Sequence, residues 1–181
     1  MPKGDAKDTK KVVSYALSDA DIKQMLGDDI SVIAYPQLEQ MSDIDQCFDR
    51  KGRCIVLYLR DSPTSGHWCC LIRRAHAIEF FDPYGEAPEE QKDGLSKSRL
   101  EALDMEQPLL TALMKKKGIP VFYNTHPFQK LRNDVATCGR HCVVRLAYKN
   151  LPIEKYAAMM KRSGLSPDEF VSGVTFKAIG K

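Results

Sequence analysis

The chain has 181 residues, of which 43% are hydrophobic and 28% are charged, and these values are ordinary for one soluble globular domain over residues 1–181. Its net charge of +3 is too small to indicate nucleic-acid binding by itself. No apolar stretch approaches the roughly 20 residues that cross a bilayer, so the composition excludes a membrane-spanning protein.

The N-terminal residues 1–13 are polar and rich in lysine, and we expect them to form a flexible arm. They contain no apolar segment that could act as a signal peptide, so the chain is expected not to be secreted. In a reducing compartment its six cysteines are expected to be free thiols rather than disulfides.

The region before the sheet predicts a helix, an extended segment and a second helix. Ser18 is a favourable N-cap, and Gly27 is expected to end the helix that begins there. Residues 30–35 are expected to be extended up to Pro36, and a second short helix is expected over 38–48.

The strongest strand signal is the continuous apolar run over 54–59, which is typical of a strand covered on both faces. A turn over 61–66 leads to a predicted strand at 68–73, and a third strand is predicted at 77–81.

The second half of the chain alternates polar connections with helices. Residues 85–106 carry Gly, Pro and many charges and are expected to form an exposed connection. The further predicted elements are a helix at 107–117, a strand at 119–123, a loop at 124–137, and helices from Gly139, from Pro152 to about Arg162 and, a short one, from Ser166. Helices on both flanks of a central mixed sheet make the predicted fold class α+β.

A histidine, a carboxylate and a cysteine follow one another at the ends of predicted elements, as His67, Asp82 and Cys138. A thiol becomes a strong nucleophile as the thiolate, an imidazole can take its proton, and a carboxylate can orient the imidazole. Gln129, upstream of the cysteine, is a candidate donor to a developing oxyanion. The pattern predicts nucleophilic catalysis by a cysteine.

The predicted elements can bring these groups together. If strands 68–73 and 77–81 are antiparallel neighbours, His67 and Asp82 share one edge of the sheet. A helix that begins at Cys138 would surround the thiol with unpaired N–H groups, which favour a thiolate and can bind an oxyanion.

These residues resemble a known superfamily over about 18–146. His67-Trp68, Phe81-Asp82-Pro83-Tyr84-Gly85, Gln129 and Cys138-Gly139 are similar, in content and order, to motifs of the adenain and SUMO-protease superfamily of cysteine proteases. The stretch 137–142 looks closest to the maturation proteases of viruses and transposons.

The resemblance implies a papain-like fold in a circularly rearranged arrangement. It assigns His67 as general base, Asp82 as orienting carboxylate, Cys138 as nucleophile and Gln129 as oxyanion donor. It also implies that Trp68 lines a narrow channel for glycine-rich substrate backbones.

Gln129 departs from the superfamily's usual spacing, because it lies nine positions before Cys138 (138 − 129). Either the intervening loop bulges, or another group such as Asn133 supplies the oxyanion donor.

The implied function is a viral maturation endopeptidase that processes capsid or core precursor proteins at glycine-rich sites. The alternatives are a deconjugating protease for ubiquitin-like modifiers, an acetyltransferase with the same triad, and a non-catalytic adaptor. We expect a monomer located in the virion or in the host cytoplasm or nucleus. The chemistry needs no cofactor, but the resemblance implies an activating peptide or DNA, and the lysines at 7–11 and 115–117 allow weak nucleic-acid binding.

A zinc site is the competing chemistry, because zinc favours cysteine and histidine ligands. The candidate ligands are Cys69, Cys70, Cys138, His141 and Cys142. Adjacent residues of a strand point to opposite faces, so Cys69 and Cys70 cannot both serve one site, and the sequence has no paired C-x-x-C arrangement. We therefore expect no metal.

Overall fold

A computed structural model describes residues 13–62, 64–132 and 134–179 of the chain. The arm expected over 1–13 lies, apart from Val13, outside these residues. No helix in the described ranges combines the length and the apolar character needed to cross a membrane.

The described strands form one mixed sheet of five strands in the order β1-β2-β3-β4-β5. Neighbours β2, β3 and β4 are antiparallel, whereas β1 is parallel to β2 and β5 is parallel to β4. The strands span β1 (Ser31–Ala34), β2 (Arg53–Ser62), β3 (Ser65–Arg73), β4 (Ile78–Phe81) and β5 (Val121–Tyr123). Every predicted strand is confirmed, with shifts of a few residues at the ends.

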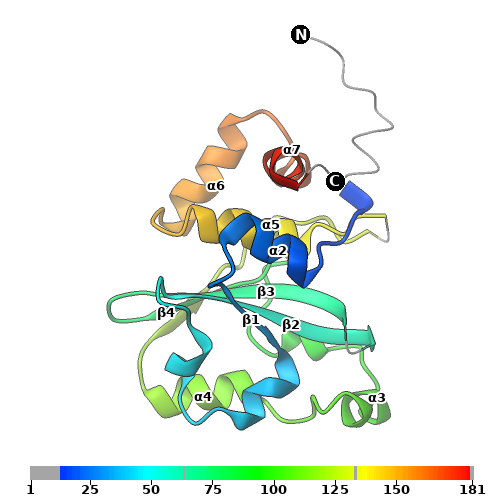
Figure 1. Ribbon diagram of the computed structural model, residues 1–181, viewed down its shortest axis with the longest axis vertical. Coiled ribbons are helices and arrows are strands. Elements are labelled where there is room, and N and C mark those ends of the chain that lie inside the picture. Colours follow the sequence, from blue (N-terminus) through cyan, green and yellow to red (C-terminus); the bar gives the residue numbers. More distant parts are fainter. Residues whose placement is uncertain (1–12, 63, 133, 180–181) are drawn as a thin grey trace.

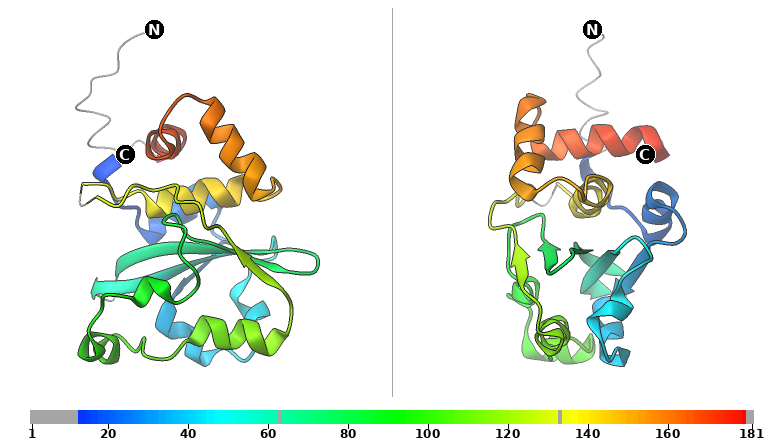
Figure 2. Two further views of the ribbon diagram at one scale, coloured as in Figure 1. Left: turned by 180° about the vertical axis from the view of Figure 1, so that it is seen from behind. Right: turned by 90° about the vertical axis from the view of Figure 1, so that its left-hand side faces the viewer.

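Helices cover both faces of the sheet, which confirms the α+β class (Figures 1 and 2). One layer contains α2 (Asp19–Leu26), α5 (Cys138–Ala147), α6 (Ile153–Arg162) and α7 (Pro167–Ile179). The opposite layer contains α3 (Lys97–Ala102), α4 (Leu109–Lys117) and the 3-10 helices η1 (Tyr35–Gln40) and η2 (Ile44–Cys47).

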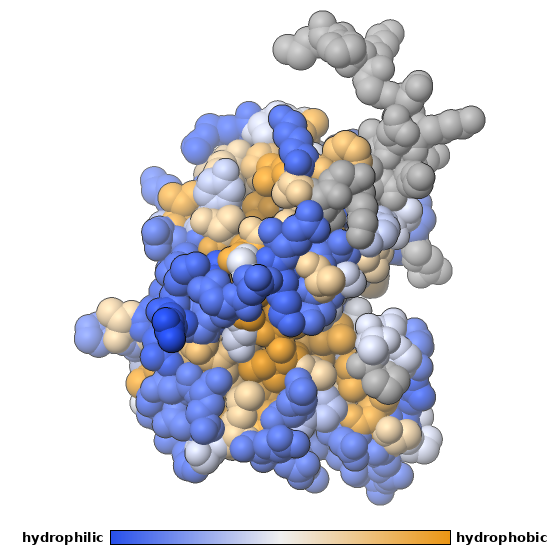
Figure 3. All heavy atoms as spheres, in the orientation of Figure 1, coloured by the Kyte–Doolittle hydropathy of each residue, from blue (hydrophilic) through white to orange (hydrophobic). Residues whose placement is uncertain are grey.

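The core lies on both faces of β2 and β3. All residues of the apolar run 54–59 are buried, as are residues 67–72 of β3. Helix α5 packs across β3, and its residues 138–146 are buried. Polar side chains cover most of the face seen in Figure 3, and hydrophobic ones gather in a hollow across its middle.

The single helix predicted over 38–48 is wrong, because the structure has two short 3-10 helices there. Side-chain hydrogen bonds to the main chain explain the difference. The Gln37 side chain accepts from the N–H of Ala34, and the Gln46 side chain accepts from the N–H of Asp43. Such local bonds compete with the hydrogen-bond ladder of a continuous helix.

The connection over 85–106 is polar but not wholly exposed. It contains η3 (Glu90–Lys92) and α3, which Ser96 caps by accepting the N–H of Arg99, and its Gln91 is buried. The last helix is longer than predicted: α7 has 13 residues, and Val171 and Thr175 on its inner face are buried.

Candidate active site

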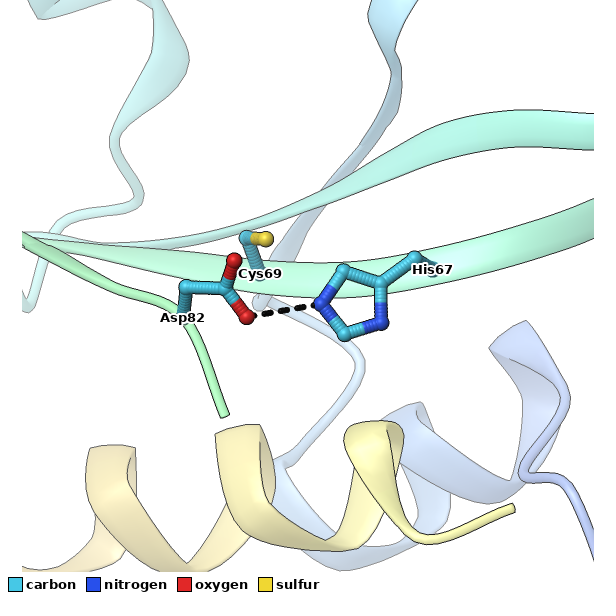
Figure 4. Close-up of side chains that lie close together, drawn as sticks. All are labelled: His67, Cys69 and Asp82. Atoms are coloured by element: carbon cyan, nitrogen blue, oxygen red, sulfur yellow. Dashed lines mark hydrogen bonds and ion pairs between the residues drawn. The ribbon is translucent and has the colours of Figure 1, made fainter. Parts of the chain in front are cut away.

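His67 and Asp82 meet at one edge of the sheet, as the antiparallel order of their strands predicts. His67 is near the start of β3, and Asp82 directly follows β4, whose Phe81 pairs with Cys70 of β3. The His67 Nε2 lies 2.8 Å from the Asp82 Oδ1, and both side chains are buried (Figure 4). The other ring nitrogen of His67 faces helix α5.

Gly66 makes this edge possible. A Cβ atom at this position would lie 1.9 Å from the main-chain oxygen of Tyr58 on β2, which is far inside the contact distance. Only glycine lets the two strands pair this closely immediately before His67.

The Asp82 carboxylate is held by two donors besides His67. Its Oδ1 accepts from the main-chain N–H of Tyr84 at 2.8 Å, and its Oδ2 accepts from the Gln91 side chain at 2.6 Å. Fixed, saturated acceptors of this kind keep an imidazole in one orientation.

Asn124 fixes the main chain of Asp82. Its Oδ1 accepts from the Asp82 N–H at 3.0 Å, and its Nδ2 donates to the Asp82 carbonyl at 2.7 Å. Sequence reasoning did not identify Asn124 or Gln91. Asn124 directly follows β5, which is parallel to β4, so the argument that placed Asp82 at a strand end could have found it.

Tyr84 forms one wall of the site. Its ring stacks on the His67 imidazole, with centroids 4.7 Å apart and planes at 15°. The sequence motif contained Tyr84 without assigning it a role, and the structure makes it a support for the imidazole ring.

Cys138 is the first residue of α5 and is 9% exposed. Its thiol interacts with His67, and each group shifts the pKa of the other. Because Asp82 occupies Nε2, the ring nitrogen that meets Cys138 is Nδ1. The structure therefore brings Cys138 together with the hydrogen-bonded pair of His67 and Asp82.

The charges of Cys138 and His67 support each other. Burial raises the pKa of the Cys138 thiol, but the hydrogen bond and charge of His67, with main-chain bonds from Trp68 and Gly139, outweigh burial and hold this pKa below its usual value. Burial alone would lower the pKa of His67, but hydrogen bonds with Asp82 and Cys138 raise it to about 10. Near neutral pH this arrangement favours a thiolate–imidazolium pair.

Gln129 lies beside the site. Its Nε2 donates to the Tyr84 hydroxyl at 3.2 Å and to the Val135 carbonyl at 3.5 Å. Its main-chain N–H donates to the Pro83 carbonyl, which ties this segment to the turn after Asp82. The alternative donor Asn133 lies outside the described residues, so the choice between the two stays a prediction.

Trp68 lies beneath the first turn of α5. It is 7% exposed, and its Nε1 donates to the Leu17 carbonyl at 3.2 Å. A Cβ atom at Gly139 would lie 3.1 Å from the Trp68 ring, so glycine lets the helix approach this closely. These contacts account for the burial of Trp68, and its role as a channel wall stays a prediction.

The potential metal ligands do not match the set proposed from the sequence. Among the residues that the structure describes, His67, Cys69 and Asp82 form a group whose ligand atoms lie within 4.8 Å of one another (Figure 4). Burial, and then the charge of Asp82, raise the pKa of the Cys69 thiol well above its usual value. Because both oxygens of Asp82 already accept hydrogen bonds, from His67, Tyr84 and Gln91, these donors fit a histidine–carboxylate pair better than a zinc site. All six cysteines are unpaired and buried, as predicted for free thiols.

A groove opens next to these residues. It has a volume of about 760 Å³, begins at Tyr84 and Gln129, and continues along the segment 126–132 to Pro167.

Comparison with known proteins gives one relative that is similar over nearly its full length. No protein-family model matches the chain. Two solved structures resemble the fold: the central domain of protein Lpg1148 from Legionella pneumophila (15% identity, 92% of this chain and 99% of that chain, TM-score 0.40), and the SUMO protease Ulp1 with its catalytic cysteine oxidized to a sulfinic acid (14% identity, 96% and 97%, TM-score 0.38). A protein of the Sputnik virophage, named uncharacterized protein V9, is 36% identical over 174 residues, which cover 93% of this chain and 99% of the relative. The chain therefore belongs to the same protein family as virophage protein V9.

Proposed function

We propose that this protein is a cysteine endopeptidase that matures viral capsid or core precursor proteins. The observation that carries the proposal is the buried arrangement of Cys138, His67 and Asp82, in which His67 bonds to Asp82 at 2.8 Å and lowers the pKa of the Cys138 thiol. It joins a nucleophile, a base and an orienting carboxylate, which is the minimum set for acyl transfer by a cysteine.

Each residue has a defined step in this reaction. The Cys138 thiolate attacks the scissile carbonyl carbon, and the carbonyl oxygen becomes an oxyanion. The C–N bond then breaks, and the His67 imidazolium gives its Nδ1 proton to the leaving amine. Neutral His67 next takes a proton from water, and the resulting hydroxide attacks the thioester. Release of the carboxylic acid product breaks the C–S bond and restores the thiolate and the imidazolium.

Two donors are available to the oxyanion. The main-chain N–H of Cys138 lies at the start of α5, where N–H groups have no partner within the helix. The Gln129 amide is the second donor, and it would exchange the Tyr84 hydroxyl for the oxyanion when substrate binds.

The groove supports a polypeptide substrate. It begins at Tyr84, which stacks on the imidazole that protonates the leaving amine, so the chain on the amine side of the scissile bond would enter it. The exposed Leu131 and the cationic Lys130 on its rim favour apolar and acidic substrate side chains.

The relative from the Sputnik virophage supports the viral role, because a protease carried by a virus is expected to act on viral proteins. We propose that the enzyme acts as a monomer, in the virion or in the infected cell. We propose that a peptide or DNA activates it, and the labelling below is therefore also done with added DNA.

Labelling with iodoacetamide at pH 6, followed by peptide mass mapping, tests the proposal first. Cys138 is expected to react fastest, because burial raises the pKa of Cys54, Cys69 and Cys142 well above the usual value and that of Cys47 to about 12. The other cysteines therefore serve as internal controls. His67→Ala should abolish the selectivity, whereas the matched variant His76→Ala, at an exposed position, should keep it. Uniform labelling of all cysteines in the native protein, both with and without added DNA, would rule the proposal out.

Substrate class is tested by incubating the protein with the capsid precursor of its own virus and, separately, with a fusion of a ubiquitin-like modifier. We expect the native protein to cleave the precursor and the Cys138→Ala variant not to cleave it. Cleavage of the modifier fusion alone would assign a deconjugating protease instead.

A further inference from the structure

A second buried carboxylate, Asp168 near the start of α7, contacts both segments that shape the site. Its Oδ1 accepts from the Thr137 hydroxyl at 2.5 Å, and Thr137 directly precedes Cys138. Its Oδ2 accepts from the main-chain N–H of Lys130 at 3.1 Å, and Lys130 directly follows Gln129. One side chain thus links the two groups that would bind the oxyanion.

His141 contacts the same carboxylate from inside α5, three residues after Cys138. Its Nε2 lies 3.0 Å from the Asp168 Oδ1, and its side chain is fully buried. Its Nδ1 is buried with no hydrogen-bond partner among the described residues. A proton is therefore favoured on Nε2, where it is donated to Asp168, and a second proton on Nδ1 would find no acceptor.

The ionisation of the pair agrees with this geometry. Burial lowers the pKa of His141, and the hydrogen bond with Asp168 opposes this effect only in part. Burial raises the pKa of Asp168, but the bonds from His141, Thr137 and Lys130 outweigh it and hold this pKa below its usual value. At neutral pH a neutral histidine donates to an ionised carboxylate.

Thr137 shows what the carboxylate does to the helix start. A threonine before the first turn of a helix usually accepts a hydrogen bond from that turn's main-chain N–H groups. Here the Thr137 side chain makes no capping bond, and its hydroxyl is directed to Asp168, to which it donates. The N–H groups at the start of α5 are thereby left to the Cys138 thiol and to the substrate.

We propose that Asp168 is a positioning residue for the reaction proposed above, on which this inference rests. It holds the Gln129 segment and the first turn of α5 at a fixed separation, and it keeps the Thr137 hydroxyl away from the N–H groups that bind the oxyanion.

The test compares two reactions of Cys138 in Asp168→Asn. Alkylation by iodoacetamide needs the thiolate but forms no oxyanion. Acylation by 4-nitrophenyl acetate transfers the acetyl group to sulfur through an oxyanion and releases 4-nitrophenolate, whose burst is measured after subtraction of the Cys138→Ala background. We expect Asp168→Asn to slow acylation at least about tenfold and alkylation less than about threefold. The proposal is overturned if the acylation rate decreases less than threefold, or if the acylation and alkylation rates decrease by the same factor.

Glu169→Gln is the matched control, because it removes the adjacent carboxylate of the same helical turn, whose hydrogen bonds within the described residues come from Ser166. The alkylation and acylation rates of this variant should equal those of the native protein. This result would exclude a general disturbance of the start of α7 as the cause of the Asp168→Asn effect.

A second variant decides the question if Asp168→Asn does not fold. Thr137→Val removes one of the bonds to Asp168 and should slow acylation selectively, and Thr137→Ser, which keeps the hydroxyl, should recover it. Equal acylation rates in Thr137→Val and Thr137→Ser overturn the proposal. If the native protein itself shows no His67-dependent alkylation, the proposed function fails. If it does and the Asp168 and Thr137 variants acylate normally, only the role of Asp168 fails.

Discussion

Glu79 and Arg145 form a buried ion pair that fixes helix α5 over strand β4. The Arg145 Nε and Nη2 lie 2.8 and 3.0 Å from the two carboxylate oxygens of Glu79, and neither side chain is more than 3% exposed. In Glu79→Leu the Arg145 guanidinium stays buried with the carbonyls of Tyr148 and Leu151 as its acceptors among the described residues, and Arg74 loses its ion-pair partner too. Loss of one partner of such a pair costs about 3–5 kcal/mol. For a chain of this size we therefore expect the melting temperature to fall by roughly 6–20 °C.

Urea unfolding followed by circular dichroism measures this loss. The double variant Glu79→Leu/Arg145→Met removes both charges of this pair but leaves Arg74, the second ion-pair partner of Glu79, which is 26% exposed. It is therefore expected to recover part of the stability lost in the single variant. A loss below about 1 kcal/mol in Glu79→Leu would refute the reasoning, because it would mean that water reaches the guanidinium. A double variant less stable than the sum of the two single losses would refute it as well.

Two further predictions concern the sheet edge. Asp82→Asn destabilises the imidazolium form of His67, which in turn stabilises the thiolate of Cys138. The pH midpoint of Cys138 alkylation should therefore move upward toward the ordinary thiol value of 9.0. An unchanged midpoint would contradict the role of Asp82. Gly66→Ala forces β2 and β3 apart. We expect the free energy of unfolding in urea to fall by about 3 kcal/mol or more and selective alkylation to be lost. A variant of native stability would show that the strands do not pair this closely.

The parts of the site that depend on local pattern and strand order were predictable. Consecutive antiparallel strands place the start of one beside the end of the other, and this alone located His67 next to Asp82. Cys138 was found because the helix after it has a clear apolar face and begins after a loop. The same rules predicted the mixed sheet and its helical layers.

The parts that depend on contacts between distant segments were not predictable. Asp168 is 31 residues from Thr137 and 38 from Lys130, and nothing in the local sequence relates it to either. Gln91 lies in a polar connection whose composition suggests only exposure. The helix predicted over 38–48 failed for a different reason, since glutamine side chains bonded to the main chain are invisible to hydrophobic periodicity.

The two bonds between Asn124 and the main chain of Asp82 have a consequence for protein engineering and for the evolution of the family. The chain leaves the sheet edge at 83 and is tied back to the same point at 124, so the part between Gln91 and β5 can change length without moving the ends of the segment. Within it, a Cβ atom at Gly94 would meet nothing within 4 Å. A reporter domain grafted at this turn should leave the reactive groups in place, and relatives could acquire new recognition modules at the same point.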